Sequence, residues 1–240
     1  NASAQRVFSH IAQDVGQLQC LAQAVRINRG GWVGLTKNLR CHFAHHAGHQ
    51  MAVALQTGVV QVTCLVQVHQ TAFDHCLQVP RLNCRAGCTP ADTDPVLVRH
   101  TLVANLRFAA EALAQHGIGL VVEMINTVDM PGFYLHRSAQ ALDVLHAVAH
   151  PNLQLQYDIY HMQRMEGELA TTLQRLLPHI GHIQIADTPG RHEPGTGEIN
   201  YPFLLRHLDA IGYQGWFGCE YHPLGDTQAG VVWLKNFLQS

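Results

Sequence analysis

The sequence lacks the features that mark membrane and nucleic-acid-binding proteins. No apolar run approaches the roughly 18 residues that a membrane-spanning helix needs, and no basic stretch suggests a lipid surface. Only two lysines occur, and the formal net charge is −2 with a pI near 6.8, so the charge balance does not favour nucleic acid. We therefore expect neither a membrane nor a nucleic-acid partner.

The seven cysteines include no C-x-x-C pair. An odd number without such a pair is typical of reduced, mostly buried thiols and not of a disulfide framework. A charged and then apolar leader is also missing from the start of the sequence. These absences predict a soluble, cytoplasmic chain, and they leave open whether it forms a homo-oligomer.

The first 80 residues contain no Glu and only two Asp, while Gln and His are abundant. A helix-like piece covers residues 11–25 and a strand-like piece covers 59–68, with few caps or turn signals between them. Residues 1–80 are therefore interpreted as an atypical N-terminal region. Our hypothesis is that this region is an out-of-frame or reverse-strand translation.

From residue 82 onward, short apolar strands alternate with helices. We expect strands at 82–87, 119–123, 153–158, 181–186 and 215–220, and helices at 94–116, 138–149, 168–177, 203–211 and 227–238. A repeated strand, loop and helix predicts a parallel sheet with right-handed connections. Residues 81–240 are accordingly predicted to form a (β/α) barrel portion that carries the active site.

Oxygen-bearing side chains stand at or near the ends of four of these strands, at Glu123, Asp158, Gln184 and Glu220. Because the carboxyl ends of parallel strands meet at one mouth, we expect the four side chains to converge. Carboxylate and amide oxygens are hard ligands that suit Mg²⁺ or Mn²⁺ and not a thiolate-loving metal. The alternative is that some of the four only cap helices or form ion pairs.

The segment from about residue 82 to the C-terminus resembles the hydroxypyruvate isomerase family of the xylose-isomerase-like TIM barrels. The motifs that carry the resemblance are Leu82-Asn-Cys with Ala86-Gly87, Val122-Glu123, Tyr157-Asp158 with His161, His182-Ile-Gln184-Ile-Ala186, Arg191-His-Glu-Pro, Gly197-Glu-Ile-Asn-Tyr-Pro, and Gly215-Trp216 with Gly218-Cys-Glu220-Tyr221. The fold implied is a TIM (β/α)8 barrel of the xylose isomerase-like type, whose first three βα units are not recognisable in residues 1–80.

The resemblance implies a metal-dependent aldose–ketose isomerase. Its reaction would interconvert hydroxypyruvate and tartronate semialdehyde (2-hydroxy-3-oxopropanoate), or a close 2-oxo acid such as 2-oxotetronate, by proton transfer through an enediolate. It also implies that Glu123, Asp158, Gln184 and Glu220 bind the divalent metal, Mg²⁺ or Mn²⁺. Glu123 and Glu220 would in addition transfer the proton.

Two further residues are candidates for binding this small acidic substrate. Arg191 has the guanidinium geometry to pair bidentately with a carboxylate, with a structural clamp as an equal alternative. His161 follows Asp158 by three residues and has the position to orient a ligand or touch the substrate, with plain packing as the alternative. In the family the segment Glu220-Tyr221 is usually followed by a long basic residue. Here it is followed by His222, which weakens the expected charge pairing with the substrate.

Three other interpretations remain. The same barrel could act as a sugar epimerase, or as a zinc-dependent endonuclease on abasic DNA. The nuclease is disfavoured because it needs more histidine ligands and a basic surface. The third interpretation is an inactive barrel fragment, because a barrel without its first strands exposes sheet edges and opens the site to water.

Overall fold

An eight-stranded sheet runs through the computed structural model, which describes residues 6–11, 21–27, 33–39, 80–89, 92–227 and 229–234. The strand order is β3-β2-β1-β8-β7-β6-β5-β4. The strands are β1 (Arg6–Ile11), β2 (Leu21–Ile27), β3 (Val33–Leu39), β4 (Arg81–Cys84), β5 (Gly119–Glu123), β6 (Leu153–Asp158), β7 (Ile180–Ile185) and β8 (Phe217–Cys219). Strands β4 to β8 are all parallel to their neighbours, so this part of the sheet is a half-barrel of the predicted class.

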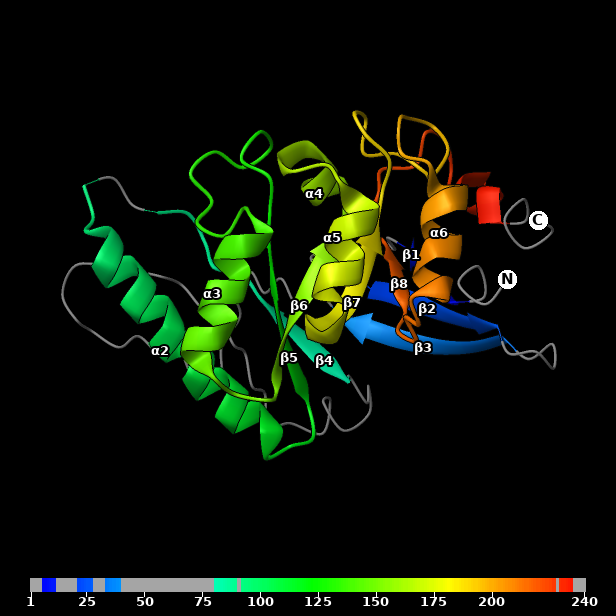
Figure 1. Cartoon of the computed structure of the whole chain (residues 1–240). Coiled ribbons are helices and arrows are strands. Elements are labelled where there is room, and N and C mark those ends of the chain that lie inside the picture. The colour runs from blue at the N-terminus through cyan, green and yellow to red at the C-terminus, as the bar shows by residue number, and fades with distance from the viewer. Residues whose placement is uncertain are drawn as a thin grey trace, which may run out of the picture.

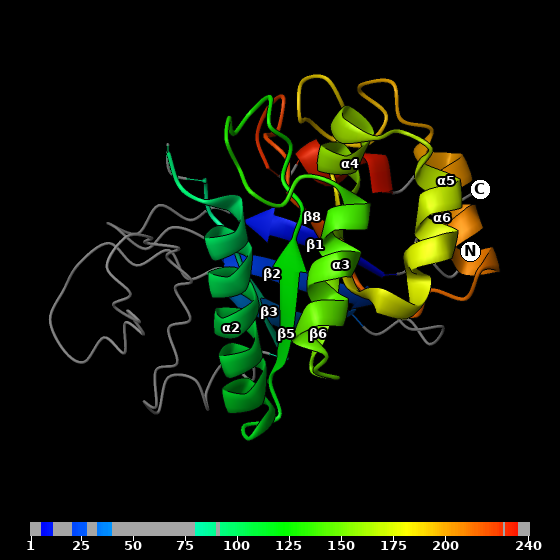
Figure 2. The ribbon, with the colours of Figure 1, turned by 60° about the vertical axis from the view of Figure 1, so that its left-hand side comes forward.

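Helices cover one face of the parallel strands. They are α2 (Pro95–Ala114), α3 (Ser138–Val148), α4 (Ile159–Met165), α5 (Leu169–Leu176) and α6 (Tyr201–Ala210), with short 3-10 turns at Leu177–His179 and Ala229–Val231. Figures 1 and 2 show α2 beside α3 and α5 beside α6, all on the outer side of the parallel strands. The connections from β5 to β8 therefore repeat the strand–helix unit that the sequence pattern predicts.

Local sequence explains where these elements begin and what they bury. The Asp94 side chain accepts a hydrogen bond from the backbone N–H of Val96, and Pro95 occupies the first turn of α2, where it needs no partner for a missing N–H. The apolar residues Val98 and Leu102, with later residues at the same spacing, are buried against the sheet. Strand β5 is apolar up to its last residue, Glu123, and its last four residues are buried, as expected for a strand covered on both faces.

Several expectations about the elements need correction. Residues 21–27 form a strand, so the helix-like reading of 11–25 is wrong there. Strand β2 runs antiparallel to both β1 and β3, and β1 pairs parallel with β8, so these three strands are not parallel βα units. The strand-like piece at 59–68 lies outside the described residues. Side-chain alternation alone does not distinguish a hairpin from a parallel unit, because both have a period of two.

Two smaller corrections concern the C-terminal half and the cysteines. The expected helix at 227–238 begins as a 3-10 turn at Ala229–Val231, and α4 lies where only a loop was expected. Cys88 and Cys219 are free thiols, as predicted, whereas Cys84 is disulfide-bonded. Sequence spacing does not reveal which cysteines the fold brings together.

Within the described residues, the helices are all too short or too polar to cross a bilayer.

The loops that follow the parallel strands collect at one end of the sheet. In Figures 1 and 2 the loops after β5, β7 and β8 rise at the same end as the short helix α4. The long loop after β7 is fastened by Asp187, whose carboxylate accepts hydrogen bonds from the backbone N–H groups of Thr188, Gly195 and Ile199. This end of the sheet is therefore where polar side chains from several strands can meet.

Candidate active site

The four predicted strand-end residues stand at this end of the sheet. Glu123 is the last residue of β5 and Asp158 the last of β6, while Gln184 lies one residue before the end of β7. Glu220 directly follows β8. In the strand register Asp158 is opposite Gln184, and Gln184 is opposite Gly218. The sheet thus places these residues along one rim.

A group of three potential metal ligands is formed by Glu123, Asp158 and His161, the one such group of His, Cys, Asp and Glu side chains in the described residues. One ligand atom from each lies within 4.8 Å of the others, and all three side chains are buried. The Oδ1 atom of Asp158 accepts from the backbone N–H of Tyr160, which caps α4. The buried Oδ2 atom of Asp158 accepts no hydrogen bond from the described residues. A divalent cation fits such a set of donors, because buried carboxylate oxygens need a positive partner.

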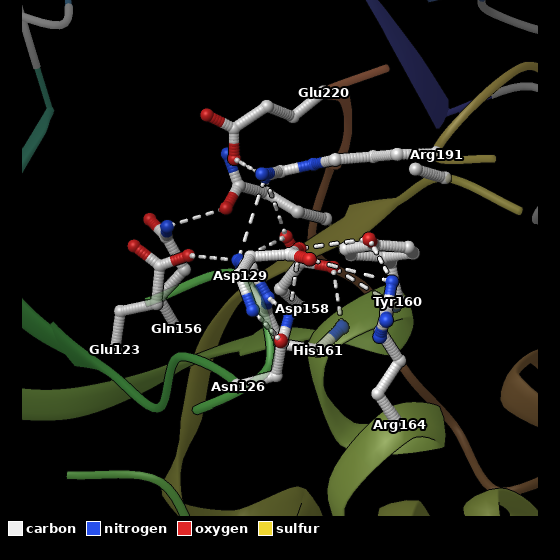
Figure 3. A network of polar contacts seen from close by, with 12 residues as sticks. Glu123, Asn126, Asp129, Gln156, Asp158, Tyr160, His161, Arg164, Arg191 and Glu220 are labelled. Carbon is white, nitrogen blue, oxygen red and sulfur yellow. Dashed lines mark hydrogen bonds and ion pairs between the residues drawn. The ribbon is translucent and has the colours of Figure 1, made fainter. Parts of the chain in front are cut away.

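Arg191 brings Glu220 into contact with this group. Its Nη2 atom lies 3.3 Å from Oε2 of Glu220, 3.7 Å from Oδ2 of Asp158 and 3.4 Å from Nε2 of His161. Figure 3 shows the guanidinium beside the Glu220 carboxylate, and the Tyr160 ring lies 5.0 Å from the guanidinium carbon. The backbone of Arg191 has φ of +56°, in the left-handed region that residues with a side chain rarely adopt. The loop thus holds a strained residue so that its cation faces two carboxylates.

Two polar neighbours of the strand-end residues were not predicted. The side-chain amide of Asn83 donates to Oε2 of Glu123 at 2.6 Å, and Gln156 donates to Oε1 of Gln184. Both contacts fix the orientation of a candidate ligand. Gln156 was in principle detectable, because it precedes Asp158 by two residues in the same strand and so faces the same side.

A hydrogen-bonded chain of groups continues from His161 to the surface. The side-chain amide nitrogen of Asn126 lies 2.6 Å from Nδ1 of His161 and donates to Oδ2 of Asp129 at 2.9 Å. The hydroxyl of Tyr160 also donates to Oδ2 of Asp129, and Arg164 lies 3.4 Å from the other oxygen. Burial raises the pKa of Asp129, but the hydrogen bonds from Asn126 and Tyr160 and the charge of Arg164 outweigh it and hold the pKa below its usual value. Asp129 therefore accepts hydrogen bonds as a carboxylate.

The loop after β7 is built so that Arg191 reaches the site. A Cβ at Gly197 would collide with the backbone carbonyl of Thr188, so glycine is required at this crossing of two chain segments. The carboxylate of Glu193 accepts from the backbone N–H of Leu224, and the backbone carbonyl of Arg191 accepts from the N–H of His222. These contacts tie the loop to the segment that follows Glu220.

Other groups near the rim are not suited to chemistry. Burial raises the pKa of the Cys219 thiol far above its ordinary value, so this cysteine is not a ready nucleophile. Burial likewise raises the pKa of Tyr201, whose hydroxyl donates to the carbonyl of Ala186 at 2.6 Å and anchors the end of β7. Both residues stabilise the frame around the site.

Comparisons with known proteins place this arrangement in a family. The hydroxypyruvate isomerase of Escherichia coli is 50% identical over 157 residues, which is 65% of this chain and 61% of that protein. The 2-oxo-tetronate isomerase of Cupriavidus necator is 48% identical over 158 residues, 66% of this chain and 61% of that protein. The chain thus spans about 61% of the length of these relatives.

Among solved structures, one described as an AP endonuclease, family 2, from Brucella melitensis is 38% identical, with a TM-score of 0.66 over 69% of this chain and 64% of that one. The family model described as "Xylose isomerase-like TIM barrel" matches residues 33–237. This family model covers most of the chain, and the parallel half-barrel agrees with its fold. The chain therefore belongs to the xylose isomerase-like TIM barrel family.

Proposed function

We propose that this chain carries the active site of a metal-dependent isomerase of short 2-oxo acids. The reaction is the interconversion of hydroxypyruvate and tartronate semialdehyde, or of a close 2-oxo acid such as 2-oxotetronate. The observation that carries the proposal is the meeting of Glu123, Asp158 and His161 at one rim, with Arg191 joining them to Glu220. The names of the two bacterial relatives support the same class of substrate.

Glu123, Asp158, Gln184 and Glu220 are the residues that would hold Mg²⁺ or Mn²⁺. When bound, such an ion acts as a Lewis acid that stabilises negative charge on the oxygens of the substrate. Gln184 contributes an oxygen without a further negative charge, in a site that must accept an anion. Its amide is already oriented by the hydrogen bond from Gln156.

Proton transfer falls to the two glutamates. Isomerisation removes a proton from the carbon next to a carbonyl and returns it to the neighbouring carbon, through an enediolate. Glu123 and Glu220 come from strands that are three apart in the sheet order, so they approach a substrate from different sides. One carboxylate takes the proton and the other returns it, each within about 3 Å of its carbon.

Arg191 and His161 are the proposed substrate-binding residues. Arg191 already faces the carboxylates of Glu220 and Asp158, and the same guanidinium can pair with the carboxylate of a 2-oxo acid. His161 is buried between the candidate ligands and the Asn126 amide. Both groups carry N–H donors where an anionic substrate would have oxygens.

The test is the replacement Glu220→Gln, assayed with hydroxypyruvate and Mn²⁺ by following tartronate semialdehyde in the proton NMR spectrum. Loss of a carboxylate that transfers the proton should lower turnover by about a hundredfold or more. The matched control is Glu198→Gln, an exposed glutamate in the loop after β7 whose side chain accepts a hydrogen bond from Gln163. Near-normal turnover of the Glu220 variant would refute its role, and no turnover by the unmodified chain would refute the proposed function.

A further inference from the structure

Asn126 stands in the loop after β5, fully buried, with a side chain that touches both His161 and Asp129. No step of the proposed reaction uses this amide. Its contacts nevertheless determine which ring nitrogen of His161 carries the proton. That choice matters because a neutral imidazole has one N–H group and one nitrogen lone pair. The N–H donates a hydrogen bond, whereas the lone pair accepts one or binds a metal.

The orientation of the Asn126 amide is fixed from two sides. Its Oδ1 atom accepts from the backbone N–H of Asp129 at 2.8 Å, and its Nδ2 atom donates to Oδ2 of Asp129 at 2.9 Å. Turning the amide over would set oxygen against the Asp129 carboxylate and N–H against the backbone N–H. Both hydrogen bonds would be replaced by repulsive contacts, so the nitrogen must face His161.

The fixed amide then fixes the ring of His161. The second N–H of Asn126 points at Nδ1 of His161 across 2.6 Å, a distance at which two donors cannot face each other. Nδ1 must therefore be the acceptor, and the proton of the neutral ring resides on Nε2. Nη2 of Arg191 also lies 3.4 Å from Nε2, but this contact is far longer and weaker than the 2.6 Å contact at Nδ1, so the Asn126 amide decides the assignment.

We propose that Asn126 is a positioning residue that holds His161 in the Nε2–H tautomer, so that His161 donates a hydrogen bond to the substrate and does not ligate the metal. The use of that donor on the substrate rests on the proposed function, whereas the tautomer itself does not. Nε2 faces the carboxylates at 3.6 Å from Asp158 and 3.9 Å from Glu123. A donor at this position can reach a substrate oxygen lying between these carboxylates, but it has no lone pair for a cation. Of the group Glu123, Asp158 and His161, only the two carboxylates then remain as metal ligands. Their oxygen donors suit Mg²⁺ or Mn²⁺.

The tautomer can be observed directly in the chain of 240 residues without metal or substrate. Nitrogen-15 histidine spectra at neutral pH distinguish a protonated ring nitrogen from a bare one, and the absence of a signal in His161→Gln identifies the His161 resonances among those of the 18 histidines. We expect a protonated Nε2 and a bare Nδ1. A protonated Nδ1 in the unmodified chain would overturn the proposal, even if the isomerase activity is present.

The variant Asn126→Asp tests control by the amide. A carboxylate only accepts hydrogen bonds, so the variant should draw the proton to Nδ1 and lower kcat at least about tenfold, as loss of a supporting contact commonly does. The control is Asn152→Asp, which removes amide donors to the carbonyls of Ala110 and Ile118 before β6, away from the site. It should lower the melting temperature without changing kcat. A folded Asn126→Asp protein whose Nδ1 stays unprotonated would refute the proposal. Absence of isomerase activity in the unmodified chain would instead refute only the proposed function.

Discussion

Replacing Arg191 by Met should destabilise the metal-free chain, although the residue lies in a loop. Its guanidinium is 3.3 Å from a carboxylate oxygen of Glu220 and 3.7 Å from one of Asp158. The Asp158 side chain has no exposed surface, and the Glu220 side chain is 14% exposed. Methionine keeps much of the side-chain volume but removes the guanidinium charge that faces these two carboxylates.

The magnitude follows from burial. Breaking a buried ion pair by removing one partner costs about 3–5 kcal/mol, because an uncompensated charge remains in a poorly solvated place. Since 22% of the Arg191 side chain is exposed and water partly screens it, we expect the lower value, about 3 kcal/mol. For a chain of this size each kcal/mol lowers the melting temperature by about 2–4 °C, so the expected loss is at least about 6 °C.

Thermal unfolding followed by circular dichroism in EDTA measures this loss. The matched control is Arg99→Met, which breaks a pair with Asp143 that is shorter, at 2.8 Å, but has side chains that are 43% and 64% exposed. An exposed pair of this kind contributes less than about 1 kcal/mol. Added Mn²⁺ should then raise the melting temperature of the Arg191 variant more than that of the wild type, in which the guanidinium already neutralises the carboxylates. Equal melting temperatures of the wild type and the Arg191 variant in EDTA would refute the reasoning.

Three further predictions follow from the loops around the site. Asp187→Asn should lose the charged acceptor for the N–H of Gly195 and cost about 1–3 kcal/mol in urea unfolding; an unchanged unfolding midpoint would contradict this role. The pKa of Asp129 is depressed in the folded chain, so its stabilisation is present above its unfolded pKa of about 3.9 and is lost as the pH falls through the folded value. The stability difference between wild type and Asp129→Asn should thus be seen at pH 6 and shrink below about pH 4. His222→Lys, next to the exposed end of the Glu220 segment, should lower KM for a 2-oxo acid by about two- to fivefold through added positive charge, with the melting temperature unchanged; an unchanged KM would count against charge pairing there.

The parallel part of the fold was readable from the sequence because short strand patterns alternate there with helical patterns. Strands β5 and β6 have the predicted bounds, and α2 begins after its Asp94 cap. The first 80 residues offered no such signals, and the hypothesis of an out-of-frame translation stays a prediction. Reading the encoding DNA in its other frames checks it, because family-like sequence in another frame is the expected result.

The supporting residues of the site were harder to predict than its strand ends. A strand fixes the direction of each side chain by alternation, so Glu123 and Asp158 could be assigned to one rim. Asn126 lies in a loop, where no period relates sequence position to direction. Its contact with His161 depends on the turn that brings the backbone N–H of Asp129 onto its side chain. It also depends on the packing of the loop after β5 against α4, so the sequence of the loop alone does not reveal it.

Asp158 shows that a capping role and the proposed metal-binding role are compatible in one carboxylate. A carboxylate at a strand end was expected either to bind a metal or to cap the next helix. Its two oxygens have different surroundings, since Oδ1 accepts from the N–H of Tyr160 at the start of α4 while the buried Oδ2 faces Arg191 and His161. The cap holds the carboxylate in one orientation, so the second oxygen is presented to the site without a loss of side-chain freedom on binding. A short helix that begins directly after a strand can therefore fix the orientation of a carboxylate at the strand end. Asp158→Asn should weaken the proposed cation site while preserving most of the cap, because an asparagine oxygen also caps helices well.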